Sequence, residues 1–158
     1  MISDVGVIIS VDSTKRWNIF IPIDPVPASR PRFSRAGRVY YSKRYASFRR
    51  EATTLLEAVE WSPVFPLSGP LAVSVVFIKT RPKTTKRLAP RGDVDNYFKS
   101  LDVLNEVVWR DDDQIVWTCV VKEYGDVCGI RLEINEIDRI PETRTLSQMQ
   151  IEGQSSEI

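Results

Sequence analysis

Histidine is absent from the 158 residues, and the only two cysteines, Cys119 and Cys128, do not form a Cys-x-x-Cys pair. The usual ligand sets of zinc therefore cannot be assembled. The absence of histidine also excludes Ser-His-Asp and Cys-His nucleophile systems and a histidine general base. Carboxylates, lysines and tyrosines remain as candidate chemical groups, and an oxygen-ligand metal site remains open to them.

Long hydrophobic runs are missing as well. No stretch approaches the roughly 20 apolar residues that span a bilayer. The first ten residues lack the basic start of a secretory signal and carry an acid at Asp4. We therefore expect a cytoplasmic protein that does not enter a membrane. The length is that of one domain with a core of its own.

Acids are missing from two segments that are rich in lysine and arginine. Residues 25–50 contain eight basic residues and residues 79–91 contain six, which is 14 of the 22 in a chain whose net charge is only +1. Such clustering is typical of surfaces that bind phosphate. The aromatic residues Phe33, Tyr40 and Tyr41 lie among these arginines and are candidates for base stacking, or equally for core or dimer contacts. The candidate DNA-binding residues are Arg30, Arg32, Arg35, Arg38, Lys83, Lys86, Arg87 and Arg91.

Hydrophobic patterning predicts four strands and two helices. The first helix follows a Ser42 cap and keeps its apolar period to Val59, and the second is capped by Asp95 and continues to Val108. The turn at 124–126 has hairpin chemistry and would join the last two strands. The predicted strands cover residues 17–23, 71–78, 114–122 and 128–135.

This order of elements predicts a single α+β two-layer domain over residues 1–137. Two helices would cover one face of a mixed sheet and leave the other face free for a partner. Residues 1–16 are expected to form a weak strand or a loose N-terminal arm. Residues 138–158 are polar and without periodicity, and we expect a flexible tail there.

A carboxylate pair follows directly on the second basic segment. Asp93 and Asp95 are two residues apart, so in extended backbone their side chains point the same way and can share one cation. Lys99 lies one helical turn beyond Asp95 on the same side. A second group of acids, Asp111–Asp113, follows the predicted helix.

Each of these residues also has an ordinary structural interpretation. Asp95 alone is most simply a helix cap, Asp111–Asp113 alone a solvated turn, and Lys99 alone a surface lysine. Their conjunction favours function, because a cationic loop that runs into an acidic pair is explained where phosphate and metal meet.

At four places the sequence resembles the RusA-type Holliday junction resolvases of bacteria and their phages. The first is Pro-Val-Pro-Ala-Ser-Arg-Pro-Arg-Phe at 25–33 with the following Arg-Val-Tyr-Tyr, and the second is Asp-Val-Asp-Asn at 93–96. The third is Lys99, and the fourth is Asp-Asp-Asp-Gln at 111–114, which leads into a strand ending Lys-Glu-Tyr-Gly at 125. The likeness covers residues 21–137.

The resemblance implies a homodimeric, Mg²⁺-dependent endodeoxyribonuclease that cuts two opposing strands of a four-way junction. Mn²⁺ would substitute for Mg²⁺, and no organic cofactor is implied. The catalytic and metal-binding carboxylates would be Asp93, Asp95 and Asp112, with Lys99 as the catalytic lysine. Two interpretations stay open beside it, a non-catalytic branched-DNA-binding module and a metal-dependent nuclease acting on other DNA structures.

One departure from the family pattern affects the register of the site. An aspartate usually lies four residues after the lysine in the family, whereas Asp102 lies three residues after Lys99 here. The linking segment is therefore one residue shorter, and Asp111 or Asp113 could take the place of Asp112.

Overall fold

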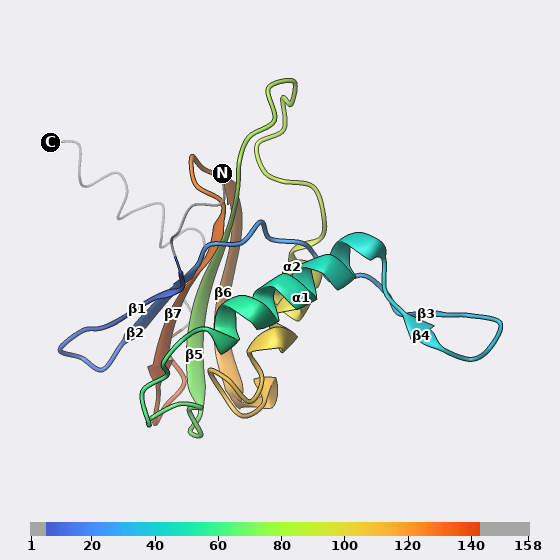
Figure 1. Ribbon diagram of the computed structural model, residues 1–158. Coiled ribbons are helices and arrows are strands. Elements are labelled where there is room, and N and C mark those ends of the chain that lie inside the picture. The colour runs from blue at the N-terminus through green and yellow to red at the C-terminus, as the bar shows by residue number, and fades with distance from the viewer. Residues whose placement is uncertain (1–5, 143–158) are drawn as a thin grey trace, which may run out of the picture.

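The computed structural model describes residues 6–142 and builds them around one five-stranded sheet (Figure 1). The central strand β5 runs parallel to β6 on one side and antiparallel to β7 on the other. The strand order is β1-β2-β7-β5-β6, with β2 antiparallel to both of its neighbours. The strands are β1 (Ile8–Val11), β2 (Trp17–Ile21), β5 (Leu71–Lys79), β6 (Ile115–Tyr124) and β7 (Gly129–Glu136).

The remaining elements are two α-helices, two 3₁₀ turns and a small separate hairpin. In Figure 1 helix α1 crosses one face of the sheet, α2 lies on the same side, and the hairpin projects away from the body beyond the start of α1. These elements are α1 (Lys43–Glu57), α2 (Val94–Lys99), η1 (Ser100–Leu104), η2 (Asp112–Gln114), β3 (Arg32–Phe33) and β4 (Val39–Tyr40). The predicted α+β fold, with a mixed sheet and two helices in a single domain, is confirmed.

The hydrophobic core lies between the sheet and the helices. Side chains alternate along a strand, so Leu71, Val73, Val75 and Phe77 of β5 share one face, and each is at most 1% exposed. The predicted cap of α1 is confirmed, because the Ser42 hydroxyl accepts a hydrogen bond from the backbone amide of Tyr45. The α1 residues buried on this core are Tyr45, Phe48, Ala52 and Leu56, at helical spacing.

The hairpin expected between the last two strands is wrong. Strands β6 and β7 lie on opposite sides of β5 and do not pair with each other. The reason lies in β5, whose residues are buried or half-buried on both faces. A strand of this kind is stabilised at the centre of a sheet with a neighbour on each edge, and a β6–β7 hairpin would have left one edge of β5 without a partner.

The second helix is also shorter than predicted, because α2 ends at Lys99 instead of Val108. A 3₁₀ turn follows to Leu104, and Glu106 then adopts a left-handed backbone with φ of 62°. This change of direction places Trp109, which is fully buried, back in the core. The backbone amide of Glu106 donates to the Trp109 carbonyl at 2.7 Å, which closes the turn.

Two further expectations concern the chain ends and membranes. Within 1–16, residues Ile8–Val11 form the edge strand β1, paired with β2. The tail expected at 138–158 lies outside the described residues from 143 onward. Among residues 6–142, no helix has the length and apolar character needed to cross a membrane.

Phe77→Ala tests how the core supports α2. The Phe77 ring lies 5.2 Å, centroid to centroid, from that of Tyr97 in α2, and both side chains are at most 1% exposed. Removing the ring leaves a cavity beneath the helix and should lower the free energy of unfolding by about 3–5 kcal/mol. Urea denaturation followed by circular dichroism measures this decrease, and a change below about 1 kcal/mol would contradict the packing.

Candidate active site and nucleic-acid interface

The carboxylate pair begins at a turn that only glycine fits. Gly92 has φ of +103°, and a Cβ there would lie 3.0 Å from Pro27 Cγ and 3.1 Å from Tyr97 Cε2. A side chain would therefore be strained both by the backbone and by its neighbours. The turn delivers the chain directly into Asp93, which occupies the N-cap position of α2.

Side chains from two other elements fix the same turn. The Tyr97 hydroxyl donates to the Arg91 carbonyl at 2.9 Å. The Lys122 ammonium, which comes from β6, donates to the Gly92 carbonyl. Asp93 therefore directly follows a turn that is hydrogen-bonded to α2 and to the sheet. Its backbone position is thus defined before any ligand binds.

Asp95 and Lys99 lie on the exposed side of α2. Their side chains are 63% and 64% exposed, and Lys99 Nζ lies 3.1 Å from Asp95 Oδ2. The hydrogen bond from Lys99 holds the pKa of Asp95 below its ordinary value. The prediction that Asp95 caps the helix is wrong, because Asp95 lies in the first turn. The Asp93 side chain makes no cap hydrogen bond and instead accepts one from Asn96 Nδ2 at 3.4 Å.

The acidic run divides into residues with different tasks. The Asp111 carboxylate accepts from the backbone amide of Asp113 at 3.1 Å, and Gln114 Oε1 accepts from the Asp111 amide at 2.9 Å. This reciprocal cap fixes Asp111 at the start of η2. Gln114 Nε2 also donates to the Leu67 carbonyl at 3.0 Å, which ties the turn to the body. Of the run, Asp111 is thus used for structure, and Asp112 carries no capping bond.

The carboxyl group of Asp112 has an unusual environment for a residue at the surface. Partial burial raises its pKa, and the hydrogen bond and negative charge of Asp111 raise it further. The charge of Asp102 contributes in the same direction. These neighbouring carboxyl groups thus disfavour a negative charge on Asp112, and a cation bound by Asp112 would offset that effect.

The structure does not gather the predicted metal ligands into a finished site. Asp93 and Asp95 belong to the start of α2, whereas Asp112 belongs to η2. Within residues 6–142, no three acidic, histidine or cysteine side chains form a group that could hold a metal ion. The carboxylate oxygens are nevertheless the donor type that Mg²⁺ prefers, and one of them, on Asp95, is paired with an ammonium.

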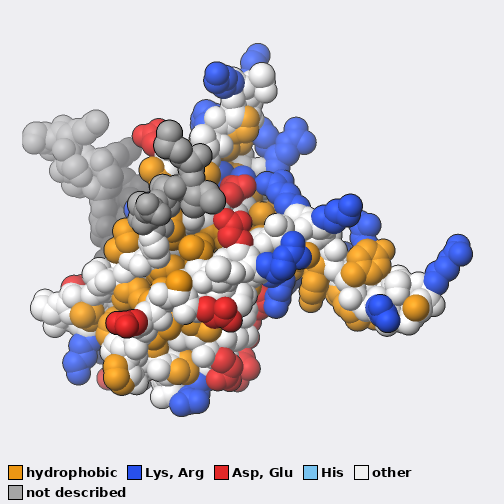
Figure 2. All heavy atoms as spheres, viewed as in Figure 1, with side chains coloured by type: hydrophobic (Ala, Val, Ile, Leu, Met, Phe, Trp, Pro, Cys, Tyr) orange, Lys and Arg blue, Asp and Glu red, His pale blue; other side chains and the backbone are white. Residues whose placement is uncertain are grey.

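Parts of the two basic segments form projecting arms. We call residues 29–42, which contain β3 and β4, the hairpin arm, and residues 80–92 the loop arm. In Figure 1 both extend from the body, and Figure 2 shows Lys and Arg side chains along each of them. Between the loop arm and the body is a cavity of about 750 Å³ whose wall includes Gly92, next to Asp93. The cations on that wall are Arg44, Lys79, Lys86, Arg87 and Arg91.

Comparison with known proteins decides the family. The sequence model described as Endodeoxyribonuclease RusA matches residues 22–135, more than half of the chain. The chain belongs to the RusA family. A protein of Bacillus subtilis (strain 168) described as Uncharacterized protein YqaN is 30% identical over 130 residues, which cover 72% of this chain and 92% of that protein. The resemblance inferred from the motifs is confirmed.

Asp102, where this RusA-family chain departs from the pattern, has a structural partner that sequence reasoning missed. Arg49 of α1 forms an ion pair with its carboxylate, and the Tyr45 hydroxyl donates to it at 3.3 Å. Asp102 thereby joins η1 to α1 and has a compensating charge. Arg49 lies four residues after Tyr45 on the same side of the helix, but this spacing does not identify Asp102 as their common partner.

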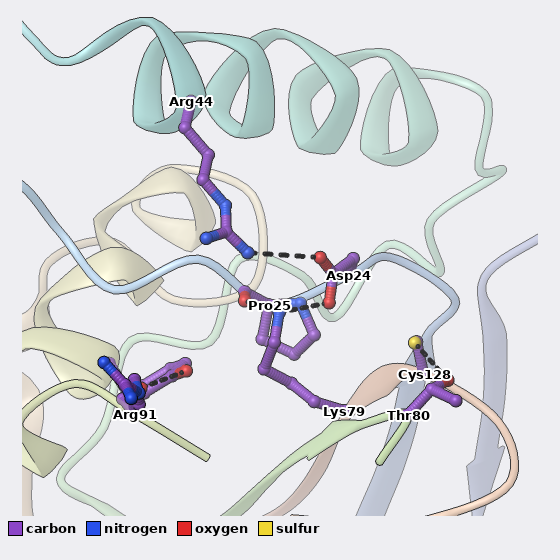
Figure 3. A network of polar contacts seen from close by, with 8 residues as sticks. Asp24, Pro25, Arg44, Lys79, Thr80, Arg91 and Cys128 are labelled. Carbon is purple, nitrogen blue, oxygen red and sulfur yellow. Dashed lines mark hydrogen bonds and ion pairs between the residues drawn. The ribbon is translucent and has the colours of Figure 1, made fainter. Parts of the chain in front are cut away.

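The hairpin arm of this RusA-family protein has an anchored base, shown in Figure 3. Asp24 pairs with Arg44 of α1 at 3.6 Å and also with Lys79 at the end of β5. Lys79 Nζ donates in addition to the Pro25 carbonyl at 3.0 Å. One acid and two cations from separate elements therefore hold the segment that leads into the arm.

Proposed function

We propose that the chain is a structure-specific endodeoxyribonuclease that resolves four-way DNA junctions by paired, Mg²⁺-dependent cuts. The observation that carries the proposal is the fixed turn at Gly92, which presents Asp93 and Asp95 at the end of a cationic loop arm in a RusA-family chain. The cations of the arm suit a phosphodiester backbone, and the adjacent carboxylates suit a divalent cation.

Mg²⁺, with Mn²⁺ as a substitute, suits the oxygen donors of Asp93, Asp95 and Asp112. The cap at Asp111 supports Asp112 as the third ligand, since Asp111 is already engaged by the Asp113 amide, and Asp111 or Asp113 remains the alternative. When bound, the metal supplies Lewis-acid stabilisation of the phosphodiester and a coordinated water of lowered pKa.

The cations of the site would act on the DNA backbone. Lys99 would leave Asp95 and place its ammonium at the scissile phosphate, where it stabilises developing negative charge. Phosphates on either side would bind the two arms, because both arms carry cations and neither contains an acid. The proposed contacts are Arg30, Arg32, Arg35, Arg38, Lys83, Lys86, Arg87 and Arg91.

A homodimer follows from the symmetry of the substrate. Resolution needs matched cuts in two opposing strands, and one chain offers one Asp93–Asp95 pair, so a closed two-fold dimer is the simplest assembly. The helix-free face of the sheet is our candidate contact, because it carries Phe20, Val76, Trp117 and Val121, the last 41% exposed. Sedimentation velocity at micromolar concentration would detect the dimer without DNA.

A panel of DNA structures separates this proposal from its alternatives. A labelled four-way junction, a linear duplex of the same arm sequence and a single strand are incubated with Mg²⁺, Mn²⁺ or EDTA. We expect cutting of the junction alone, supported by either metal and abolished by EDTA. Equal cutting of the linear duplex would favour a nuclease for other DNA structures. Junction binding without cutting in both metals would favour a non-catalytic binding module.

A further inference from the structure

The hairpin arm has two chemically different faces. Its two strands are paired so that Phe33 lies opposite Val39, and Arg32 lies opposite Tyr40. Because side chains alternate along each strand, the Phe33–Val39 pair occupies one face and the Arg32–Tyr40 pair the other. Phe33 is 72% exposed and Val39 is 56% exposed. The first face is thus apolar and open, and the second combines a cation with an aromatic ring.

The tip of the arm is ordered by its own hydrogen bonds. The backbone amide of Ser34 donates to the Arg38 carbonyl at 2.9 Å, and the Gly37 amide donates to the Ser34 carbonyl at 2.9 Å. The Ser34 hydroxyl also accepts from the Arg38 amide at 3.1 Å. Gly37 takes a left-handed backbone, with φ of 72°, that suits glycine. Phe33, directly before this turn, is therefore presented at the end of a defined loop.

The two ends of the arm, which we call its neck, are joined to each other. One aromatic residue of the arm, Tyr41, belongs to this neck. The Ser42 backbone amide donates to the Ser29 hydroxyl at 3.2 Å, which joins the two ends of the arm. Tyr41 packs edge-on against Tyr45 of α1 with ring centroids 5.3 Å apart, and Arg49 lies over its ring. Tyr41 is thus part of the neck, whereas the side chain of Phe33 is free to meet a partner.

The charge of the arm indicates which partner this is. Residues 25–50 contain no acid, and arginines occupy both the strand and the turn of the hairpin. In a two-fold contact between hairpin arms, a second copy of this chain would bring an equally cationic surface against this one. Nucleic acid instead offers phosphates for the arginines and base faces for the ring. Proteins that bend or open DNA use an apolar side chain between base steps with arginines on the flanking phosphates.

We propose that the hairpin arm is a wedge whose Phe33–Val39 face enters the opened centre of a branched DNA and stacks on an unpaired base. Arg32, Arg35 and Arg38 hold the phosphates on either side of that base. This inference rests on the proposed function, since it requires a DNA with an open branch point. It adds an element that recognises the branch point, separate from the carboxylates, and this element cuts no bond.

The test uses a junction with 2-aminopurine beside the base that the wedge would contact, because 2-aminopurine brightens when its stacking on a neighbouring base is lost. In an Asp93→Asn background, which prevents cutting, the protein should raise the fluorescence, and adding Phe33→Ala should remove most of the rise. With Asp93 intact, Phe33→Ala should cut the junction about 10-fold more slowly. Phe33→Trp should retain both the fluorescence rise and the wild-type rate of cutting. Val64→Ala, which trims a 46% exposed side chain in the loop between α1 and β5, should change neither.

Three results would overturn the wedge. Full fluorescence and full cutting by Phe33→Ala would do so while leaving the junction resolvase intact. Conversion of the protein to a monomer by Phe33→Ala in sedimentation velocity would assign the face to a subunit contact. A wild-type protein that neither binds nor cuts the junction would remove the proposed function, and the wedge with it.

Discussion

Asp93→Asn is expected to lower the rate of Mg²⁺-dependent junction cutting by at least about 100-fold. The substitution keeps the size of the side chain and the turn at Gly92 but removes the negative charge that the proposed metal requires. Binding should persist or tighten, because a carboxylate beside phosphate repels it when no metal is present. Single-turnover cutting and gel-shift titration of the same junction measure the two properties separately.

Glu60→Gln is the control, since Glu60 is exposed beyond the C-terminal end of α1, at the opposite end of that helix from the hairpin arm. It makes the same change of charge away from α2 and should leave cutting unaltered. Asp95→Asn and Asp112→Asn are expected to behave as Asp93→Asn does. Cutting at the wild-type rate by Asp93→Asn would contradict the assignment of the carboxylates as metal ligands, even though the chain belongs to the RusA family.

Neutralising Arg30, Arg32 and Arg35 together is expected to weaken binding to junction and linear duplex alike. For every phosphate that the protein no longer neutralises, the slope of log affinity against log salt should become shallower by about 0.9. For three lost phosphate contacts, the affinity gained between 1 M and 0.1 M salt should be smaller than that of the wild type by as much as about 500-fold. Fluorescence anisotropy across a salt series gives both the affinity and the slope.

A control of equal charge neutralises cations outside both arms. Lys15, Arg110 and Arg139 are exposed and suit this purpose. Their replacement should change the slope little, because long-range attraction is screened at 0.1 M salt over about 10 Å. If the control and the arm variant gave the same slope, net charge rather than contact with the hairpin arm would explain the binding.

The sequence predicted those elements whose signals are local. The stripe from Tyr45 to Leu56 and the Ser42 cap were sufficient to define α1, and β5 followed from its β-branched run. The partner of β6 and of β7, which is β5 in both cases, was not predictable from the Gly125 turn. Their pairing depends on the two edges of β5, a strand far away in sequence. The early end of α2 had the same origin, since the burial of Trp109 overrides local helical periodicity.

The site divides in a similar way. Lys99 was expected beside Asp95 from helical spacing, and the 3.1 Å contact confirms it. The cap made by Asp111 and the pairing of Asp102 with Arg49 depend on tertiary packing, which spacing does not report. The roles of Asp93, Asp95 and Asp112 as metal ligands stay a prediction, as does the contact of the arms with DNA.

The most direct test of the proposed resolvase is the product formed from a supercoiled plasmid with an extruded cruciform. A dimer that places one carboxylate cluster on each of two opposing strands should convert it in Mg²⁺ to linear DNA within one binding event, with little nicked circle. The Asp93→Asn protein should leave the plasmid supercoiled. Nicked circles that accumulate first, or equal cutting of a plasmid without the cruciform, would contradict the junction resolvase.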